Sequence, residues 1–173
     1  MTTHLVVMGV SGSGKTTVAE GVVARTGWVF AEADAFHPQA NIDKMASGTP
    51  LTDEDRWPWL RDLGAWMAEH GAKGADTVIT CSALKRVYRD VLREEVATLG
   101  SGHRVVFAHL DGSAEVIAAR LEGRQGHFMP ASLLQSQIDT LEVLDADEDG
   151  VVLDLAASPD ELVERVMGTV APR

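Results

Sequence analysis

One octapeptide near the start of the chain constrains its fold more than any other feature. Residues 9–16 read GVSGSGKT, which matches G-x-x-x-x-G-K-[ST] at every fixed position. An apolar run, Leu5–Met8, precedes the octapeptide, and a helical pattern, Lys15–Arg25, follows it. A strand, a glycine-rich turn and a helix N-terminus in this order form a cradle for phosphate groups.

Each residue type in this phosphate-binding loop (P-loop) has a physical task. Gly9, Gly12 and Gly14 let the backbone turn its N–H groups towards phosphate oxygens. Lys15 brings a positive charge to the outer phosphates, and the Thr16 hydroxyl can bind magnesium. We therefore expect a nucleoside triphosphate and Mg²⁺ at this loop. The expected nucleotide contacts are Gly9, Val10, Ser11, Gly12, Ser13, Gly14, Lys15, Thr16 and Thr17.

Apolar runs alternate with longer amphipathic stretches along the 173 residues. The expected strands are Leu5–Met8, Trp28–Ala31, Thr77–Cys81, Val105–Leu110 and Val151–Leu155. The expected helices are Lys15–Arg25, Asp53–His70, Lys85–Leu99, Ala114–Arg120, Ala131–Leu141 and Pro159–Val166. Val- and Ile-rich strands separated by helices predict an α/β fold with a parallel sheet. No repeat or low-complexity linker interrupts the pattern, so we expect one domain over residues 1–173.

Charge and composition exclude several classes of partner. The formal net charge is −11, which makes the chain a poor general binder of nucleic acid or anionic membranes. The apolar run Leu5–Val10 is too short to cross a bilayer, and no basic signal-peptide region precedes it. Cys81 is the single cysteine, so no internal disulfide can form. We expect a cytoplasmic protein that binds neither nucleic acid nor membrane.

The P-loop indicates a nucleoside triphosphate but leaves the reaction open. A GTPase would need a base-reading N-K-x-D motif, which the sequence lacks. Residues 147–150 spell D-x-x-G, but they belong to the polar run Asp145–Gly150, which we interpret as a surface loop. A motor ATPase usually needs a longer chain. Small-molecule and nucleotide kinases remain.

Two carboxylates stand at the expected end of the second strand. Glu32 and Asp34 are two residues apart, so their side chains point to the same side of an extended chain. In open α/β sheets, ligands bind beyond the carboxyl ends of the strands. One carboxylate there can organise magnesium, and the other can accept the proton of an attacking hydroxyl.

Two long stretches break the alternation of strands and helices. Residues 32–51 lie between a strand and a helix, and residues 120–130 contain Arg120, Arg124 and two glycines. Loops of this length in a compact domain are often functional. We expect a mobile lid at about residues 120–130, whose arginines act on the transferring phosphoryl group.

Several further runs, together with the P-loop, make the sequence resemble the small P-loop gluconokinases over nearly its whole length. These runs are residues 34–48 (with His37-Pro38, Asn41-Ile42 and Lys44–Gly48), 51–60, 81–85, 88–90 and 126–128. The stretch from His37 to Leu60 separates this family from shikimate and adenylate kinases. Glu32 stands where the resemblance leads us to expect Asp, so its carboxylate reaches further.

The resemblance implies a fold like the nucleoside monophosphate kinases: a five-stranded parallel sheet flanked by helices, with a mobile lid. It implies transfer of the ATP γ-phosphoryl group to the 6-hydroxyl of D-gluconate, and a homodimer, so the expected cofactors are ATP and Mg²⁺. We expect catalytic roles for the lid arginines Arg120 and Arg124, and the residues that match in position give catalytic roles to Lys15 and Asp34. They give substrate contacts to Asp34, His37, Arg56, Lys85, Arg89 and His127, and magnesium contacts to Thr16 and Glu32.

The basic residues of the third expected helix, Lys85–Leu99, need separate interpretation. Lys85, Arg89 and Arg93 are spaced i, i+4, i+8 and share one helix face. Lys85 and Arg89 closely follow an expected strand end, where a substrate would bind. For Arg86 and Arg93 we expect a solvated face, with Asp90 and Glu94 as ion-pair partners.

Two other functions compete with a gluconate kinase. One is a kinase for another small polyol acid, of the shikimate type. The other is a regulatory module that binds ATP without catalysis. Intact Lys15, Thr16 and Asp34 argue against the second alternative.

Overall fold

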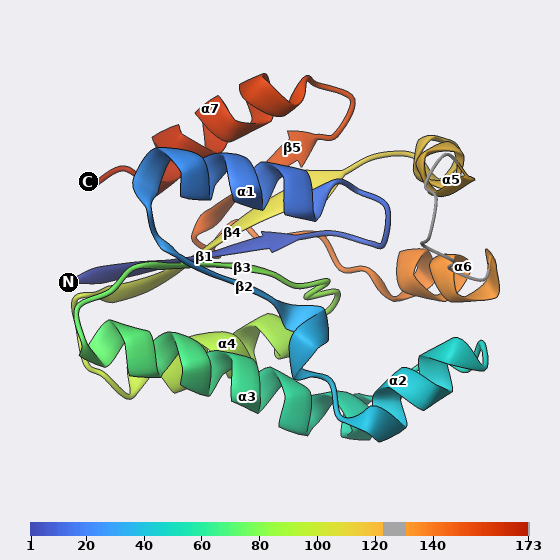
Figure 1. The fold of residues 1–173 in the computed structure, drawn as a ribbon, viewed down its shortest axis with the longest axis horizontal. Coiled ribbons are helices and arrows are strands. Elements are labelled where there is room, and N and C mark those ends of the chain that lie inside the picture. Colours follow the sequence, from blue (N-terminus) through green and yellow to red (C-terminus); the bar gives the residue numbers. More distant parts are fainter. Residues whose placement is uncertain (123–130, 173) are drawn as a thin grey trace.

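The computed structural model describes residues 1–122 and 131–172 (Figure 1). A five-stranded parallel sheet has the strand order β2-β3-β1-β4-β5. Its strands are β1 (Thr2–Met8), β2 (Val29–Glu32), β3 (Thr77–Thr80), β4 (His103–Asp111) and β5 (Gly150–Asp154). All five strands agree with the sequence prediction to within a few residues, and the predicted α/β class and parallel sheet are confirmed.

Helices cover both faces of this sheet. One face carries α1 (Lys15–Thr26) and α7 (Pro159–Val170), and the other carries α3 (Asp53–Ala72) and α4 (Arg86–Ala97) (Figure 1). The central strand β1 is therefore covered on both sides, and Leu5, Val6, Val7 and Met8 are fully buried. This double burial explains why β1 is continuously apolar rather than alternating.

Local sequence signals set the ends of the long helices. Thr52 caps α3 in a capping box, in which its hydroxyl accepts from the Asp55 N–H and the Asp55 carboxylate accepts from the Thr52 N–H. Ser158 caps α7, and Pro159 occupies the first turn, where no backbone donor is needed. These caps fix the first residues of α3 and α7, and therefore where the loops before these two helices end.

The remaining elements gather beyond the carboxyl end of the sheet (Figure 1). They are the 3₁₀ helix η1 (Ala33–Phe36), α2 (Gln39–Ala46), α5 (Ala114–Glu122) and α6 (Ala131–Thr140). The sequence prediction of an irregular stretch over residues 32–51 was wrong, because η1 and α2 lie within it. Most of the predicted lid, residues 123–130, lies outside the described residues. No helix in the described ranges is long and apolar enough to cross a membrane.

Candidate active site

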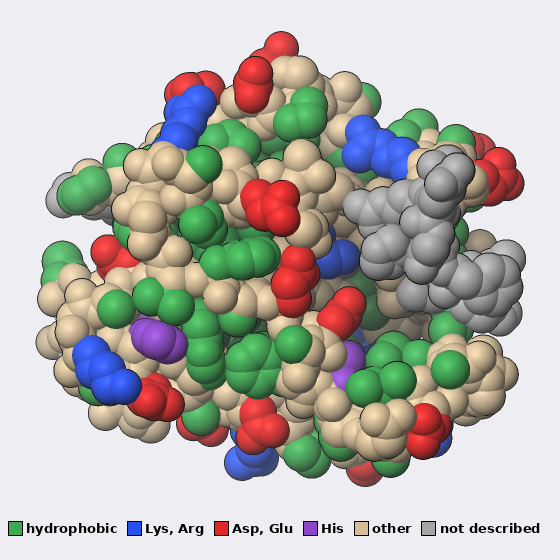
Figure 2. All heavy atoms as spheres, in the orientation of Figure 1, with side chains coloured by type: hydrophobic (Ala, Val, Ile, Leu, Met, Phe, Trp, Pro, Cys, Tyr) green, Lys and Arg blue, Asp and Glu red, His purple; other side chains and the backbone are tan. Residues whose placement is uncertain are grey.

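A cleft of about 440 Å³ opens at the carboxyl end of the sheet. Figure 2 shows a hollow in the surface with acidic, basic and histidine side chains around it. Its walls come from the P-loop, β2, η1, α2, α3, the segment after β3 and α6. Of the residues predicted from the sequence, the cleft brings together Ser11, Gly12, Gly14, Lys15, Thr16, Glu32, Asp34, His37 and Arg56.

The P-loop follows β1 directly and wraps the start of α1. A Cβ atom on Gly9 would lie only 2.8 Å from the carbonyl oxygen of Leu110, so only glycine fits against β4 there. Gly14 precedes α1 with a φ of +92°, a conformation that glycine adopts without strain. Lys15 Nζ lies 3.0 Å from the carbonyl oxygens of both Gly9 and Val10, so the ammonium group stays folded over the loop.

Two hydroxyls and one carboxylate meet beside the P-loop. The Thr16 hydroxyl donates to Glu32 Oε1 at 2.9 Å, and the Thr80 hydroxyl donates to the other Glu32 oxygen. No group of three or more His, Cys, Asp or Glu within the described ranges could hold a metal by itself. A hydroxyl backed by a carboxylate suits Mg²⁺, which prefers oxygen ligands and takes the others from phosphates and water.

Asp34 and His37 both line the cleft. Asp34 belongs to η1, and His37 is the residue directly after it. The Asp34 side chain is exposed, whereas the His37 ring stacks on Trp59 with 4.1 Å between centroids. Trp59 Nε1 donates to the carbonyl of Ala33 at 2.8 Å, which fastens η1 to α3. Burial lowers the pKa of His37, opposed by Asp34 and assisted by Arg56. His37 is therefore a neutral hydrogen-bonding group at physiological pH.

A cluster of polar side chains from α3 and the start of α4 lies behind the part of the cleft that Arg56 lines. Arg56 lines the cleft and donates to the Tyr88 hydroxyl at 2.9 Å. That hydroxyl donates to Asp53, whose carboxylate also accepts from Lys85 Nζ at 3.2 Å. The hydrogen bond from Tyr88, with the contribution of Lys85, lowers the pKa of Asp53. Arg56 thus presents a positive charge to the cleft, while the Lys85 ammonium group is held by Asp53.

Arg89 is a correction to the sequence prediction. Its side chain is fully buried, does not line the cleft, and makes a two-pronged ion pair with Glu148 at 2.7 and 3.0 Å. Helical spacing placed Arg89 on one face with Lys85, but the acidic run before β5 folds over that face. A direct contact between Arg89 and a substrate is therefore incompatible with the structure.

The same network changes the interpretation of the acidic run. Arg86 binds Asp90 at 3.0 Å, as expected, and also Asp147 at 2.8 Å; Arg93 binds Asp90 at 2.9 Å. The run 145–150 is exposed at Asp145 and Asp147, but the Glu148 side chain is completely buried. The prediction of a simple surface loop was wrong at Glu148.

Arg120 lies in the last turn of α5, close to the P-loop. Its Nη2 donates to the carbonyl of Leu155 at 2.6 Å, and a Cβ atom on Gly14 would lie 3.4 Å from its Nη1. Arg120 is therefore near the phosphate cradle, as its predicted role requires. Arg124 and His127 lie outside the described residues.

Sequence reasoning missed several residues that line the cleft. Trp59 was not among the predicted site residues, yet it packs in the core and also forms part of the wall. Gln137 of α6 reaches the P-loop, where its Oε1 accepts from the Ser11 N–H at 2.7 Å. Trp59 lies in the run 51–60 that carries the resemblance, but without a chemical role there, and Gln137 lies in none of the quoted runs. Only the tertiary positions of α3 and α6 bring them to the site.

Known proteins resemble this chain over most of its length. A family model described as an AAA domain matches residues 5–144. A gluconokinase from Gluconobacter oxydans (strain 621H) is 50% identical over 163 residues, covering 94% of this chain and 88% of the relative. The thermosensitive gluconokinase of Escherichia coli (strain K12) is 48% identical over 147 residues, covering 85% of this chain and 75% of the relative.

Solved structures give the same result. An unliganded sugar kinase from Janibacter sp. HTCC2649 is 60% identical, with a TM-score of 0.92, covering 98% of this chain and 95% of the other. A gluconokinase from Sinorhizobium meliloti 1021 is 46% identical, with a TM-score of 0.82, covering 96% and 90% of the two chains. With a P-loop, a strand-end carboxylate pair and relatives of this identity and coverage, the chain belongs to the gluconokinase family of P-loop kinases.

Proposed function

We propose that the protein transfers the γ-phosphoryl group of ATP to the 6-hydroxyl of D-gluconate. One observation carries this proposal: a single cleft holds a phosphate cradle, an exposed carboxylate at Asp34 and a cation at Arg56. Kinship with proteins named gluconokinases supports gluconate as the acceptor.

The nucleotide side supplies positive charge where charge shifts during transfer. Lys15 lies on the loop that holds the phosphates and is the group that stabilises the leaving and transferring phosphoryl oxygens. Arg120, close to Gly14, is placed to assist from the other side of the loop. Arg124 shares this catalytic role in the proposal because of its place in the expected lid, and His127 contacts the substrate on the family resemblance.

Thr16 and Glu32 are the proposed magnesium residues. Thr16 would provide a hydroxyl ligand, and Glu32 accepts a hydrogen bond from that hydroxyl at 2.9 Å, which orients it. When bound, Mg²⁺ neutralises charge on the outer phosphate oxygens. Thr80 holds the second Glu32 oxygen, which fixes the carboxylate in one orientation.

The acceptor side positions gluconate and removes a proton. Asp34 is exposed in the cleft, so its carboxylate is free to accept the proton of the attacking hydroxyl. Arg56 pairs with a carboxylate of the acceptor, and neutral His37 hydrogen-bonds a hydroxyl. Lys85 lies behind the wall, where its ammonium group pairs with Asp53 at 3.2 Å and supports the cluster that binds Arg56. Holding both ends of a flexible acid brings the 6-oxygen to the γ-phosphoryl group.

Identification of the product tests this proposal. The protein is incubated with ATP, Mg²⁺ and ¹³C-labelled gluconate, and the products are followed by NMR. We expect ADP and an acceptor whose C6 signal is split by phosphorus. Release of inorganic phosphate without phosphorylated gluconate, or phosphorylation at another carbon, would contradict it.

A further inference from the structure

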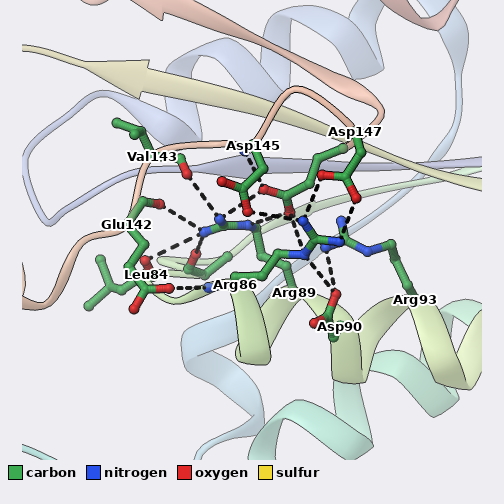
Figure 3. A network of polar contacts seen from close by, with 11 residues as sticks. Leu84, Arg86, Arg89, Asp90, Arg93, Glu142, Val143, Asp145 and Asp147 are labelled. Carbon is green, nitrogen blue, oxygen red and sulfur yellow. Dashed lines mark hydrogen bonds and ion pairs between the residues drawn. The ribbon is translucent and has the colours of Figure 1, made fainter.

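Arg89 is a fully buried arginine whose hydrogen-bonding capacity is directed at the backbone around the cleft (Figure 3). Nε and Nη2 form the two-pronged pair with Glu148. Nη1 donates to the carbonyls of Ala83 at 2.9 Å and Glu142 at 3.1 Å, and Nη2 to that of Val143 at 3.3 Å. A side chain that binds several main-chain oxygens acts as a brace between segments.

The segments joined by Arg89 continue into two different parts of the cleft wall. Ala83 lies between Ser82 and Leu84, both of which line the cleft after β3. Glu142 and Val143 follow α6, whose residues Leu133, Ser136 and Gln137 also line the cleft. The Glu142 N–H also donates directly to the Leu84 carbonyl at 2.7 Å. Arg89 therefore sets how the segment after β3 lies relative to α6.

The brace holds a backbone conformation that would not persist by itself. Ala83 has a φ of +46°, a left-handed conformation that is unfavourable for a residue with a Cβ atom. Its carbonyl is one of the oxygens bound by Arg89. Removing this donor would leave a buried carbonyl without its partner and free the strained residue to relax.

Arginine suits this position for geometric reasons. Its planar fork supplies donors in two directions at once, so one edge binds Glu148 while the other binds the carbonyls. Burial alone would raise the pKa of Glu148, but the hydrogen bonds from Arg89, Asp145 and Arg93 lower it to about 2. The pair therefore stays ionised in the interior.

We propose that Arg89 is a positioning residue for the phosphoryl acceptor, which it never touches, by holding Ser82–Leu84 and the end of α6 at a fixed separation. The inference rests on the proposed function. Within the described residues Arg89 itself contacts no P-loop residue, and α6 reaches the P-loop through the hydrogen bond from the Ser11 N–H to Gln137, in the last turn of the helix. Loss of the brace should therefore weaken use of the acceptor far more than ATP binding.

The test compares Arg89→Lys with Arg93→Met. Lysine keeps the positive charge but lacks the guanidinium fork. It therefore cannot bind Glu148 and the carbonyls of both wall segments, at Ala83 and at Glu142 and Val143, at the same time. Arg93 also binds Glu148, at 2.6 Å, from the same helix, but contacts no carbonyl of the cleft wall in the described residues. Arg93→Met is thus a matched control, because it removes an ion pair to Glu148 but no hydrogen bond to the cleft wall.

We expect Arg89→Lys to raise the KM for gluconate roughly tenfold or more, since small displacements of a positioned reactant have large effects. The dissociation constant for ATP, measured by titration calorimetry, should stay within about twofold. Arg93→Met should leave both quantities within about twofold. An equal loss of ATP and gluconate affinity in Arg89→Lys, or an unchanged gluconate KM, would overturn the proposal.

Hydrogen exchange supplies a readout that does not depend on gluconate being the substrate. Amides in residues 82–85 and 141–144 should exchange faster in Arg89→Lys than in Arg93→Met, while the P-loop amides are unaffected. If Arg89→Lys does not fold, Glu148→Gln, which keeps the shape of the acid, should show the same pattern to a smaller degree. Unaltered exchange in both wall segments would overturn the proposal that Arg89 holds them in place. Inactivity of the wild type on gluconate would instead overturn the proposed function.

Discussion

The nucleotide side and the acceptor side of the cleft are built in different ways. The nucleotide side is essentially one short run, residues 9–17, and it presents backbone groups, the Lys15 ammonium and the Thr16 hydroxyl. The acceptor side takes side chains from η1 and α3, among them Asp34, Arg56 and Trp59, and α6 lines the cleft while binding the P-loop through Gln137. Residues behind the wall, such as Tyr88 and Arg89, hold these groups in place.

This difference teaches where each kind of binding is vulnerable. A local loop whose glycines fix the backbone depends little on distant packing. A wall assembled from separate helices depends on every contact that holds those helices together. Substitutions on the acceptor side should therefore affect gluconate without affecting ATP, and substitutions in the P-loop should do the reverse.

The largest expected effect comes from Asp34→Asn, which keeps the size of the side chain but removes its basicity. Turnover should fall on the order of a thousandfold, within the range for loss of a general base. ATP affinity, measured by titration calorimetry, should be unchanged, because Asp34 lies on the acceptor side. If turnover survives and only gluconate binding is lost, Asp34 positions the substrate and does not accept its proton.

Lys15→Ala tests the nucleotide side. Loss of this charge should raise the barrier by about 3 kcal/mol, or roughly a hundredfold in kcat. Gluconate KM should change little, since Lys15 bonds within its own loop. Steady-state kinetics with a circular dichroism check of folding decide the matter. Near-normal turnover by a folded variant would contradict the assignment of the P-loop.

A smaller effect is expected from Tyr88→Phe, which removes one hydroxyl behind the acceptor wall. That hydroxyl accepts from Arg56 at 2.9 Å and donates to Asp53. Its loss should cost about 1 kcal/mol of acceptor binding, or roughly a fivefold rise in gluconate KM. The KM for ATP serves as the internal control. A parallel rise in both KM values would show that the two sides are not separate.

The smallest effect on activity is expected at the opposite end of the sheet, where His4 is fully buried between the hydroxyls of Thr2 and Thr77. Burial lowers its pKa to about 4 from 6.5, with Asp76 opposing. Protonation therefore favours the unfolded chain as the pH falls from 6.5 towards 4. Protonation of His4 should lower the free energy of unfolding by about 3 kcal/mol over that pH range.

Chemical unfolding at several pH values tests this prediction. His4→Gln should flatten the decline in stability between pH 6.5 and 4, while its KM values at pH 7.5 match those of the wild type. An equally steep decline in His4→Gln would show that other groups titrate there. A change in either KM would show that the two ends of the sheet are coupled.

The sequence was most informative where structure is local. The P-loop, the strand before it and the helix after it depend on neighbouring residues, so motif and periodicity were sufficient. The helix α2 was missed because residues 32–51 were interpreted through their glycine, proline and polar side chains. The run Gln39–Ala46, directly after Pro38, consists of residues compatible with a helix.

Tertiary neighbours decided the rest. The spacing of Arg89 and Arg93 correctly predicts a shared face, on which both bind Glu148. Lys85 instead stands in extended conformation before α4 and binds Asp53 of α3, and the spacing does not show what covers the face. Glu148, within a run of acidic residues, is the partner that buries Arg89, and only its position after α6 makes that contact. Trp59 and Gln137 were likewise not predictable as cleft residues, because their roles depend on how α3 and α6 are placed.

The most direct test of the account is a comparison of acceptors in a coupled assay of ADP release. Gluconate, glucose and shikimate are each supplied with ATP and Mg²⁺ at matched concentrations. Glucose lacks the carboxylate that Arg56 would pair with, and the rigid ring of shikimate places its acid and hydroxyls differently. We predict a kcat/KM for gluconate that exceeds both others by roughly a hundredfold or more. Comparable activity on glucose or shikimate, or ADP release that is independent of any acceptor, would contradict the account.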